Sequence, residues 1–222
     1  MPSSSYVFFD FDKTLICKDS FKLLFSYLIK KSPYKAINLL LFLPVFILLF
    51  FFVEKRKLLK SYLLWTLTFF GSQKSILKNL NYFGTAQKNI WFQDAIIEME
   101  RLKKENFRIV IISASGQKWV RSLFHDIPIK PNLILGSKLK YFLGGLIFSS
   151  YNCREKMKLF RIKELGLDTV NWERGYSDHP DDIPFLKLCK SVFVISPKKK
   201  NIAYFEKNLN DYKILKWKRL HS

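Results

Sequence analysis

The sequence predicts an α/β protein with a mainly parallel sheet. Two observations support this prediction: short apolar runs typical of strands end directly at polar residues, and apolar patterns with helical spacing separate these runs. The run at 6–9, Tyr-Val-Phe-Phe, is followed by Asp10, and the run at 109–112, Ile-Val-Ile-Ile, is followed by Ser113. Because open α/β sheets bind ligands at the carboxyl ends of their strands, we expect these polar residues to share one site.

The first polar cluster, Asp-Phe-Asp-Lys-Thr-Leu at 10–15, places two carboxylates two positions apart. One carboxylate can attack phosphorus to form an aspartyl-phosphate, while the other protonates the leaving group and then activates water. Two close carboxylates and a phosphate repel one another, so such a site requires a cation such as Mg²⁺. Taken alone, Asp10 and Asp12 would also suit a turn or the start of a helix.

Two later residues supply groups for the phosphoryl oxygens, where charge spreads in the transition state. Ser113 offers a hydroxyl, and Lys156 offers a cation. Arg154 and Lys158 compete with Lys156 for this role. Lys156 is preferred because it directly precedes a helical apolar pattern that runs from 157 to 165.

The last cluster, Tyr-Ser-Asp-His-Pro-Asp-Asp at 176–182, is rich in carboxylates. Oxygen ligands of this kind suit Mg²⁺, and Asp178 with Asp182 would complete its shell. Asp181 is interpreted as a solvated loop residue or a more distant neighbour of the ion.

Residues 36–53 form an apolar segment without a single charged residue. As a helix it would span roughly 27 Å, close to the thickness of a bilayer core. A second apolar stretch at 61–71 follows, basic residues flank the first, and Pro44 predicts a kink at its midpoint. The site residues before and after the segment must meet, so we expect a re-entrant or in-plane hairpin with both basic ends at an anionic surface. The alternative is a soluble helical cap that buries the apolar helix.

The chain has 222 residues and a formal net charge of +20, which predicts an anionic partner. Its three cysteines are scattered without metal-site spacing, so neither a disulfide framework nor a zinc site is expected. Basic residues mixed with aromatic ones can suit nucleic acid, but the longest apolar run is uncharged, and nucleic acid is therefore not expected as a partner.

The four clusters together resemble the motifs of the haloacid dehalogenase superfamily: DxDx[TV], a strand-ending Ser or Thr, a Lys, and a loop with paired Asp residues. The resemblance implies a Rossmann-like, doubly wound core made of residues 1–17 and 90–222. An all-helical, membrane-associated cap at 18–89 would be inserted after the first motif. The implied roles are nucleophile for Asp10, general acid/base for Asp12, phosphate binding for Thr14, Ser113 and Lys156, and Mg²⁺ binding for Asp10, the Asp12 carbonyl, Asp178 and Asp182.

Within the superfamily, residues 9–15, the apolar segment and residues 176–186 resemble the phosphatidylglycerophosphatase C family. This implies hydrolysis of phosphatidylglycerophosphate to phosphatidylglycerol and phosphate. The partners would be an anionic phospholipid and the membrane, with the catalytic core on the cytoplasmic side of the bacterial inner membrane. The alternative is a soluble phosphatase of the phosphoserine phosphatase type, acting on a small metabolite. A more distant alternative is a non-catalytic basic module that binds membranes or nucleic acid.

Overall fold

A computed structural model describes residues 5–51, 55–149 and 156–219, without the side chains of Lys55, Arg56 and Lys156. Its centre is a six-stranded sheet with the strand order β3-β2-β1-β6-β7-β8. All of its strand pairs are parallel, which confirms the predicted sheet. The strands are β1 (Tyr6–Phe9), β2 (Arg108–Gly116), β3 (Leu133–Ser137), β6 (Trp172–Ser177), β7 (Ser191–Ile195) and β8 (Lys213–Leu215).

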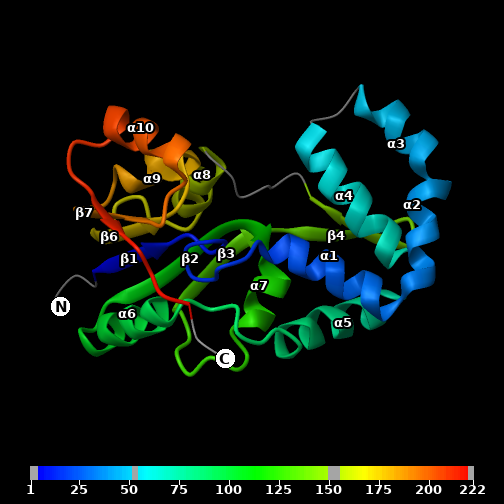
Figure 1. Ribbon diagram of the computed structural model, residues 1–222, viewed down its shortest axis with the longest axis horizontal. Helices are drawn as coiled ribbons and strands as arrows, with labels where there is room; N and C mark the ends of the chain where they lie inside the picture. The colour runs from blue at the N-terminus through cyan, green and yellow to red at the C-terminus, as the bar shows by residue number, and fades with distance from the viewer. Residues whose placement is uncertain (1–4, 52–54, 150–155, 220–222) are drawn as a thin grey trace.

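Helices cover both faces of this sheet, as a doubly wound fold requires (Figure 1). One face packs against α6 (Gln93–Lys104) and α7 (Gln117–Leu123), and the other against α8 (Lys156–Glu164), α9 (Ile183–Leu186) and α10 (Lys199–Asn208). A short 3₁₀ turn, Pro180–Asp182, leads into α9.

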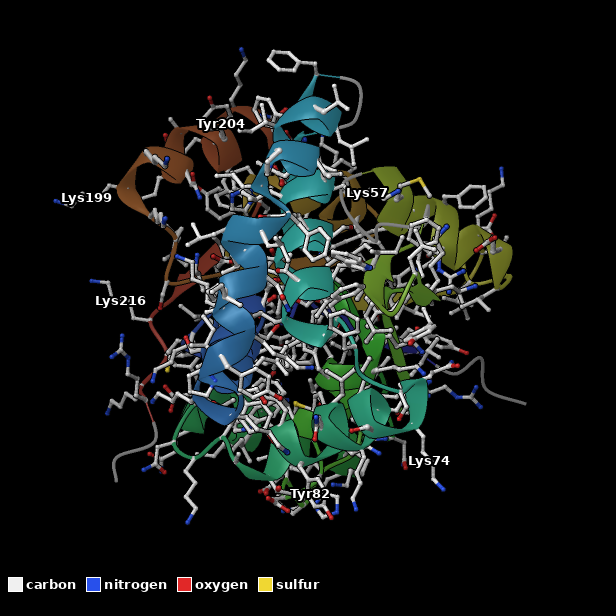
Figure 2. All side chains as sticks on the ribbon, turned by 90° about the vertical axis from the view of Figure 1, so that its right-hand side faces the viewer. Lys57, Lys74, Tyr82, Lys199, Tyr204 and Lys216 are labelled. Carbon is white, nitrogen blue, oxygen red and sulfur yellow. The ribbon has the colours of Figure 1, made fainter. Side chains whose placement is uncertain are left out.

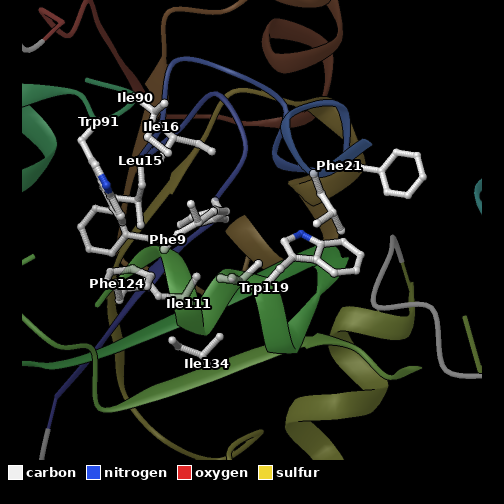
Figure 3. Packing of buried hydrophobic residues seen from close by; sticks show 14 of the residues in the cluster. Phe9, Leu15, Ile16, Phe21, Ile90, Trp91, Ile111, Trp119, Phe124 and Ile134 are labelled. Atoms are coloured by element: carbon white, nitrogen blue, oxygen red, sulfur yellow. The ribbon is translucent and has the colours of Figure 1, made fainter. Parts of the chain in front are cut away.

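Successive side chains of β1 point to opposite faces of the sheet, and they contribute to a separate hydrophobic cluster on each face. Val7 and Phe9 belong to the hydrophobic cluster on the α6 and α7 side, whereas Phe8 belongs to the cluster on the other side. Figure 3 shows the first of these clusters, where Phe9 and Ile111 lie among aromatic side chains such as Trp119. Because β1 is buried on both faces, its sequence is a continuous apolar run rather than an alternating one.

A group of helices lies beside the sheet, in the part of the chain between β1 and α6 (Figure 1). It begins at Asp19, whose side chain caps α1 by accepting a hydrogen bond from the Lys22 amide. The domain boundaries at 17/18 and 89/90 remain predictions. The elements of this group are α1 (Ser20–Lys31), a 3₁₀ turn (Pro33–Ala36), α2 (Ile37–Leu41), α3 (Leu43–Phe50), α4 (Lys55–Thr68) and α5 (Gln73–Thr85).

An antiparallel hairpin formed by β4 (Leu139–Phe142) and β5 (Gly145–Phe148) joins these helices from a later part of the chain. The indole N–H of Trp65 in α4 donates a hydrogen bond to the Phe142 carbonyl. The Thr68 hydroxyl accepts a hydrogen bond from the Leu146 amide, and the Ser61 hydroxyl accepts one from the Phe148 amide. The described elements within the predicted cap, residues 18–89, are all helical, and the hairpin from a later part of the chain packs against them. The attachment of this hairpin to α4 was not predicted from the sequence.

The apolar segment is broken in the way Pro44 predicts. The helical stretches Pro33–Leu41 and Leu43–Phe50 meet at a bend of 51°, and Pro44 lies in the first turn of α3. Among the described residues, no single helix has the length and apolar character to cross a bilayer, and this bent pair alone meets both criteria. In α2 and α3, Asn38 alone is buried, so these helices do not form the buried apolar helix of the soluble alternative.

Candidate active site

Five of the predicted site residues come together close to the carboxyl ends of β1, β2 and β6. A cavity of about 370 Å³ is lined by Asp10, Asp12, Ser113, Asp178 and Asp182. Lys60 of α4 and Asp19 at the start of α1 also line it, so the cavity lies between the sheet and the cap helices. The acidic, hydroxyl and basic side chains that line it include Asp10, Asp12, Lys13, Ser113, Lys158, Asp178, His179, Asp181 and Asp182.

Lys158 is the cation at the centre of this cavity. Its Nζ lies 2.7 Å from Asp10 Oδ1 and 2.6 Å from Asp182 Oδ1, and all three side chains are buried. Burial by itself lowers the pKa of Lys158, but the carboxylates of Asp10 and Asp182 outweigh this and raise it. Lys158 therefore stays charged and holds the two carboxylates in fixed positions.

Asp12 is held at both carboxylate oxygens. Oδ1 accepts a hydrogen bond from the Ser20 amide at 2.7 Å, and Oδ2 accepts one from the Ser115 hydroxyl at 2.5 Å. Burial raises the pKa of Asp12, while the hydrogen bond from Ser115 opposes the rise. A carboxyl with a raised pKa can carry a proton closer to neutral pH, as a general acid must.

Thr14 joins the first loop to the fourth. Its buried hydroxyl accepts a hydrogen bond from the Asp178 amide at 3.0 Å, across 164 positions of sequence. In the second motif, the Ser113 hydroxyl accepts the Ser115 amide at 3.0 Å. Because a hydroxyl has one hydrogen to donate, this arrangement leaves the Ser113 hydrogen available for a phosphoryl oxygen.

The carboxylates of this site concentrate negative charge in a buried place. Burial raises the pKa of Asp178 to about 7, and Asp182 adds to the rise, while Lys13 opposes it. Burial likewise raises the pKa of Asp10 well above its usual range, although Lys158 opposes this rise. A bound cation would relieve this strain between neighbouring charges.

The ligand atoms that the site offers are of the type that Mg²⁺ prefers. Asp10, Asp178 and the Asp12 carbonyl provide hard oxygen ligands, and Mg²⁺ is usually held by one or two carboxylates while it keeps several waters. In the part of the chain that the structure describes, no three Asp, Glu, His or Cys side chains are grouped to hold an ion by themselves. Water and phosphate oxygens would therefore complete the shell.

Residues 7–187 match the family model of haloacid dehalogenase-like hydrolases. The chain belongs to this family. In this haloacid dehalogenase-like hydrolase, the fold brings Asp10, Ser113 and Asp178, the residues predicted for the first, second and fourth motifs, together in one cavity.

Solved structures show the same fold at low sequence identity. A protein of unknown function from Bordetella pertussis Tohama I shares 12% identity with a TM-score of 0.73, over 96% of this chain and 98% of that chain. A phospho-aspartyl intermediate analogue of phosphoserine phosphatase shares 15% identity with a TM-score of 0.58, over 97% of this chain and 95% of that chain. A substrate-bound phosphoserine phosphatase complex shares 12% identity with a TM-score of 0.60, over 96% and 94%.

Two of the sequence assignments, Lys156 and Asp182, stay predictions in this hydrolase. The lysine role was given to Lys156, whose side chain lies outside the described residues, and the structure places the Lys158 ammonium against Asp10. Asp182 was assigned to Mg²⁺. In the structure its Oδ1 pairs with Lys158, and its Oδ2 accepts a hydrogen bond from the Ser177 hydroxyl at 2.7 Å. Asp182 therefore helps to hold Lys158 in place, and its assignment to Mg²⁺ stays a prediction.

Sequence reasoning missed three residues that position the site. Ser20 and Ser115 hold Asp12, and Ser177 holds Asp182. Ser177 is the residue before Asp178, a position where the superfamily often has Gly. The Ser177 hydroxyl donates a hydrogen bond to Asp182 that a glycine could not make. For Ser115, the spacing of two positions from Ser113 is only a weak indication that it belongs to the site. No sequence signal identifies Ser20, because its contact with Asp12 depends on how α1 begins.

Proposed function

We propose that this chain is a phosphomonoesterase that works through an aspartyl-phosphate on Asp10. The observation that supports it most directly is the convergence of Asp10, Asp12, Ser113 and Lys158 on one cavity. Asp10 is buried and paired with Lys158, which suits a carboxylate that must attack an anionic phosphoryl group. The likeness to phosphoserine phosphatases adds support, since one of them is described as a phospho-aspartyl intermediate analogue.

The reaction takes two steps that share the same residues. An Asp10 oxygen attacks phosphorus, the ester P–O bond breaks, and Asp12 gives its proton to the leaving alkoxide. Water then attacks the phosphorus of the aspartyl-phosphate, Asp12 takes a proton from that water, and the carboxylate of Asp10 is restored. Ser113 and Lys158 bind the phosphoryl oxygens in both steps.

We propose that Asp10, Asp178 and the Asp12 carbonyl hold Mg²⁺ when it is bound. The ion would neutralise charge on the phosphoryl oxygens and on the neighbouring carboxylates. Asp182 is left out of this ligand set, because its role is to hold Lys158.

The first candidate substrate is a small polar phosphomonoester of the phosphoserine type. The solved phosphoserine phosphatases of the same fold favour it. The cavity also suits it, because Asp19 and Lys60 add a carboxylate and an ammonium to the lining. These two groups can pair with an amino group and with a carboxylate of a small substrate.

The second candidate is phosphatidylglycerophosphate, and the exposed apolar face of α2 and α3 favours it. Ile37, Leu40, Leu48 and Phe51 are 67%, 71%, 63% and 78% exposed. Figure 2 looks onto this side of the molecule, where α2 and α3 run along the outer surface beside α4. Soluble monomers rarely expose large apolar patches, and such patches often mark sites that bind proteins or membranes.

A second cavity, of about 590 Å³, lies between α3, α4 and the β4–β5 hairpin. Aromatic side chains such as Phe46, Trp65 and Phe142 line it together with Lys57 and Lys140. Its volume is in the range of about 300–1,000 Å³ typical of ligand sites. For a lipid substrate, this cavity would accept an acyl chain, and its lysines would face the anionic headgroup region.

With a lipid substrate, the protein would bind the cytoplasmic face of the bacterial inner membrane through α2 and α3. The net charge of +20 would favour an anionic surface. An anionic phospholipid is then the partner, and nucleic acid is not.

The experiment that tests the function measures Mg²⁺-dependent phosphate release by wild type and Asp10→Asn. The substrates are phosphoserine, an aryl phosphate and phosphatidylglycerophosphate in vesicles. Turnover that Asp10→Asn abolishes supports the reaction. Selective release from phosphoserine supports the first candidate, and selective release from the lipid supports the second. No release from any ester would overturn the proposal.

Vesicle binding separates the candidates further. Leu48→Glu places a charge on the exposed face of α3, and Ile97→Glu places one on α6, where Ile97 is similarly exposed. If α2 and α3 enter a bilayer, Leu48→Glu releases the protein from anionic vesicles and Ile97→Glu does not. Equal behaviour of the two variants would contradict the membrane proposal.

A further inference from the structure

A chain of three hydrogen bonds ends on Asp12. The indole Nε1 of Trp119 donates to Ser20 Oγ at 3.2 Å, and Ser20 Oγ donates to Ser115 Oγ at 2.8 Å. Ser115 Oγ then donates to Asp12 Oδ2 at 2.5 Å. Trp119, Ser20 and Ser115 are buried, so water does not compete for these groups.

The direction of this chain is fixed by its last member. An ionised carboxylate can only accept, so the single hydroxyl hydrogen of Ser115 is directed to Asp12. Ser115 Oγ must then accept from Ser20, and Ser20 Oγ accepts from the indole N–H of Trp119. The ionised Asp12 carboxylate therefore receives a donor from Ser115.

The backbone amides of Ser20 and Ser115 also donate hydrogen bonds to residues of the site. The Ser20 amide donates to the other oxygen of Asp12, and the Ser115 amide donates to the Ser113 hydroxyl. Ser115 thus contacts both the proposed acid/base and the proposed phosphate-binding hydroxyl. Because both carboxylate oxygens of Asp12 are held, its side chain has one preferred orientation.

We propose that Ser115 and Ser20 are positioning residues that aim Asp12 at the leaving oxygen and at the attacking water, with Trp119 holding the Ser20 hydroxyl at the far end of the chain. This inference rests on the proposed phosphomonoesterase reaction. Proton transfer requires the carboxyl within hydrogen-bond reach of the reacting oxygen, so an Asp12 that rotates freely transfers its proton less often.

The arrangement also connects the cap helices to the chemistry. Ser20 is the first residue of α1, and Trp119 belongs to α7 on the sheet side (Figure 1). Figure 3 shows Trp119 packed beside Phe21, the residue after Ser20. The orientation of Asp12 therefore depends on where α1 begins. A shift of α1 would move the Ser20 amide, which donates to Asp12, together with the Ser20 hydroxyl, which donates to Ser115.

The test compares an alkyl phosphate with para-nitrophenyl phosphate. An alkoxide needs a proton as it leaves, whereas nitrophenolate hardly does, so loss of a well-aimed acid affects the alkyl ester more. In Ser115→Ala, we expect kcat/KM to fall about 10- to 100-fold for the alkyl ester and less than about threefold for the aryl ester. Ser122→Ala is the control, because its hydroxyl lies on α7 and donates to the Trp119 carbonyl, outside the chain of donors.

A double-mutant cycle decides whether Ser115 acts through Asp12. In an Asp12→Asn background, Ser115→Ala should cause little further loss, because the group it positions is already gone. Equal losses for both esters, or losses that multiply in the double variant, would overturn the inference and leave Ser115 with a merely structural role.

A readout independent of activity separates this inference from the proposed function. The indole ¹⁵N–¹H resonance of Trp119 should move in Ser20→Ala, because its acceptor is removed. An unmoved resonance would overturn the chain of donors even in an active enzyme. No phosphate release from any ester by wild type would instead overturn the proposed function, whatever the resonance shows.

Discussion

Lys158 Nζ lies 2.7 Å from Asp10 Oδ1, although the two residues are 148 positions apart. Lys158 also contacts Asp182, so one buried cation joins the proposed nucleophile to the fourth motif. Breaking such a buried pair on one side leaves an uncompensated charge, which costs more than an exposed ion pair contributes. The position of Lys158 is therefore a feature of both stability and chemistry.

Lys158→Ala should lower kcat/KM for any turned-over ester by about 10²- to 10³-fold, because a charge that stabilises the phosphoryl oxygens is lost. Lys156→Ala is the matched control on the same helix, and we expect a change of less than about threefold. Steady-state phosphate release measures both. A larger loss in Lys156→Ala would restore the assignment made from the sequence.

The predicted acids line one cavity, whereas the contact of Lys158 with two of them was not predicted from the sequence. Asp10 follows an apolar β1, a strong local signal that places its carboxylate at a strand end. In α8 the apolar pattern is misleading, since Phe160 is 46% exposed while Lys158 and Arg161 are buried beside Ile162. Periodicity assigns lysines to the solvent face, so a lysine buried for its charge partners cannot be recognised by it.

The packing of the β4–β5 hairpin against α4 could not be predicted from the sequence either. Trp65 meets the Phe142 carbonyl across 77 positions, and this contact depends on the tertiary arrangement of α4 rather than on a local pattern. The bend at Pro44 was predictable, because proline restricts its own backbone and that of the residue before it.

Stability of the metal-free protein should fall as pH rises from about 4 to about 7, a window set by Asp178. Burial raises the pKa of Asp178 to about 7 from its ordinary value of 3.8. Between these values the folded state holds a proton that the unfolded state has released, so the free energy of unfolding decreases with pH. Asp10, whose pKa burial also raises, acts in the same direction.

Thermal unfolding at pH 5 and pH 8, with and without Mg²⁺, checks this prediction. Mg²⁺ should raise the Tm more at pH 8, where Asp178 is ionised, and Asp178→Asn should show a flatter pH profile and a smaller response to Mg²⁺. A wild-type protein that gains stability between pH 5 and pH 8 without metal would contradict the expectation.

Lys60 of α4 lines the catalytic cavity from the cap side. Its charge would attract the anionic substrate in the ground state and in the transition state alike, so Lys60→Ala should raise KM more than it lowers kcat. Lys74→Ala on α5 is the control, since Lys74 is exposed and is not among the residues that line the cavity. A variant with unchanged KM and reduced kcat would show that Lys60 acts on the chemical step instead.

Gly84 allows α5 to approach α7 closely. A Cβ at this position would lie 1.9 Å from the Ser122 carbonyl oxygen, so Gly84→Ala forces the two helices apart. We expect a loss of about 1–3 kcal/mol in the free energy of unfolding, measured by urea titration. Thr85→Ala changes the next, exposed residue and should have an effect of less than about 0.5 kcal/mol. Similar stability of the two variants would show that the helices adjust.

The most direct measurement of the central claim is acid-quench trapping of the phosphoenzyme during turnover, followed by mapping of the labelled peptide. The account predicts Mg²⁺-dependent label on Asp10 in wild type, and no label in Asp10→Asn or Asp10→Ala. Label on another residue, or turnover that persists in both Asp10 variants, would contradict it.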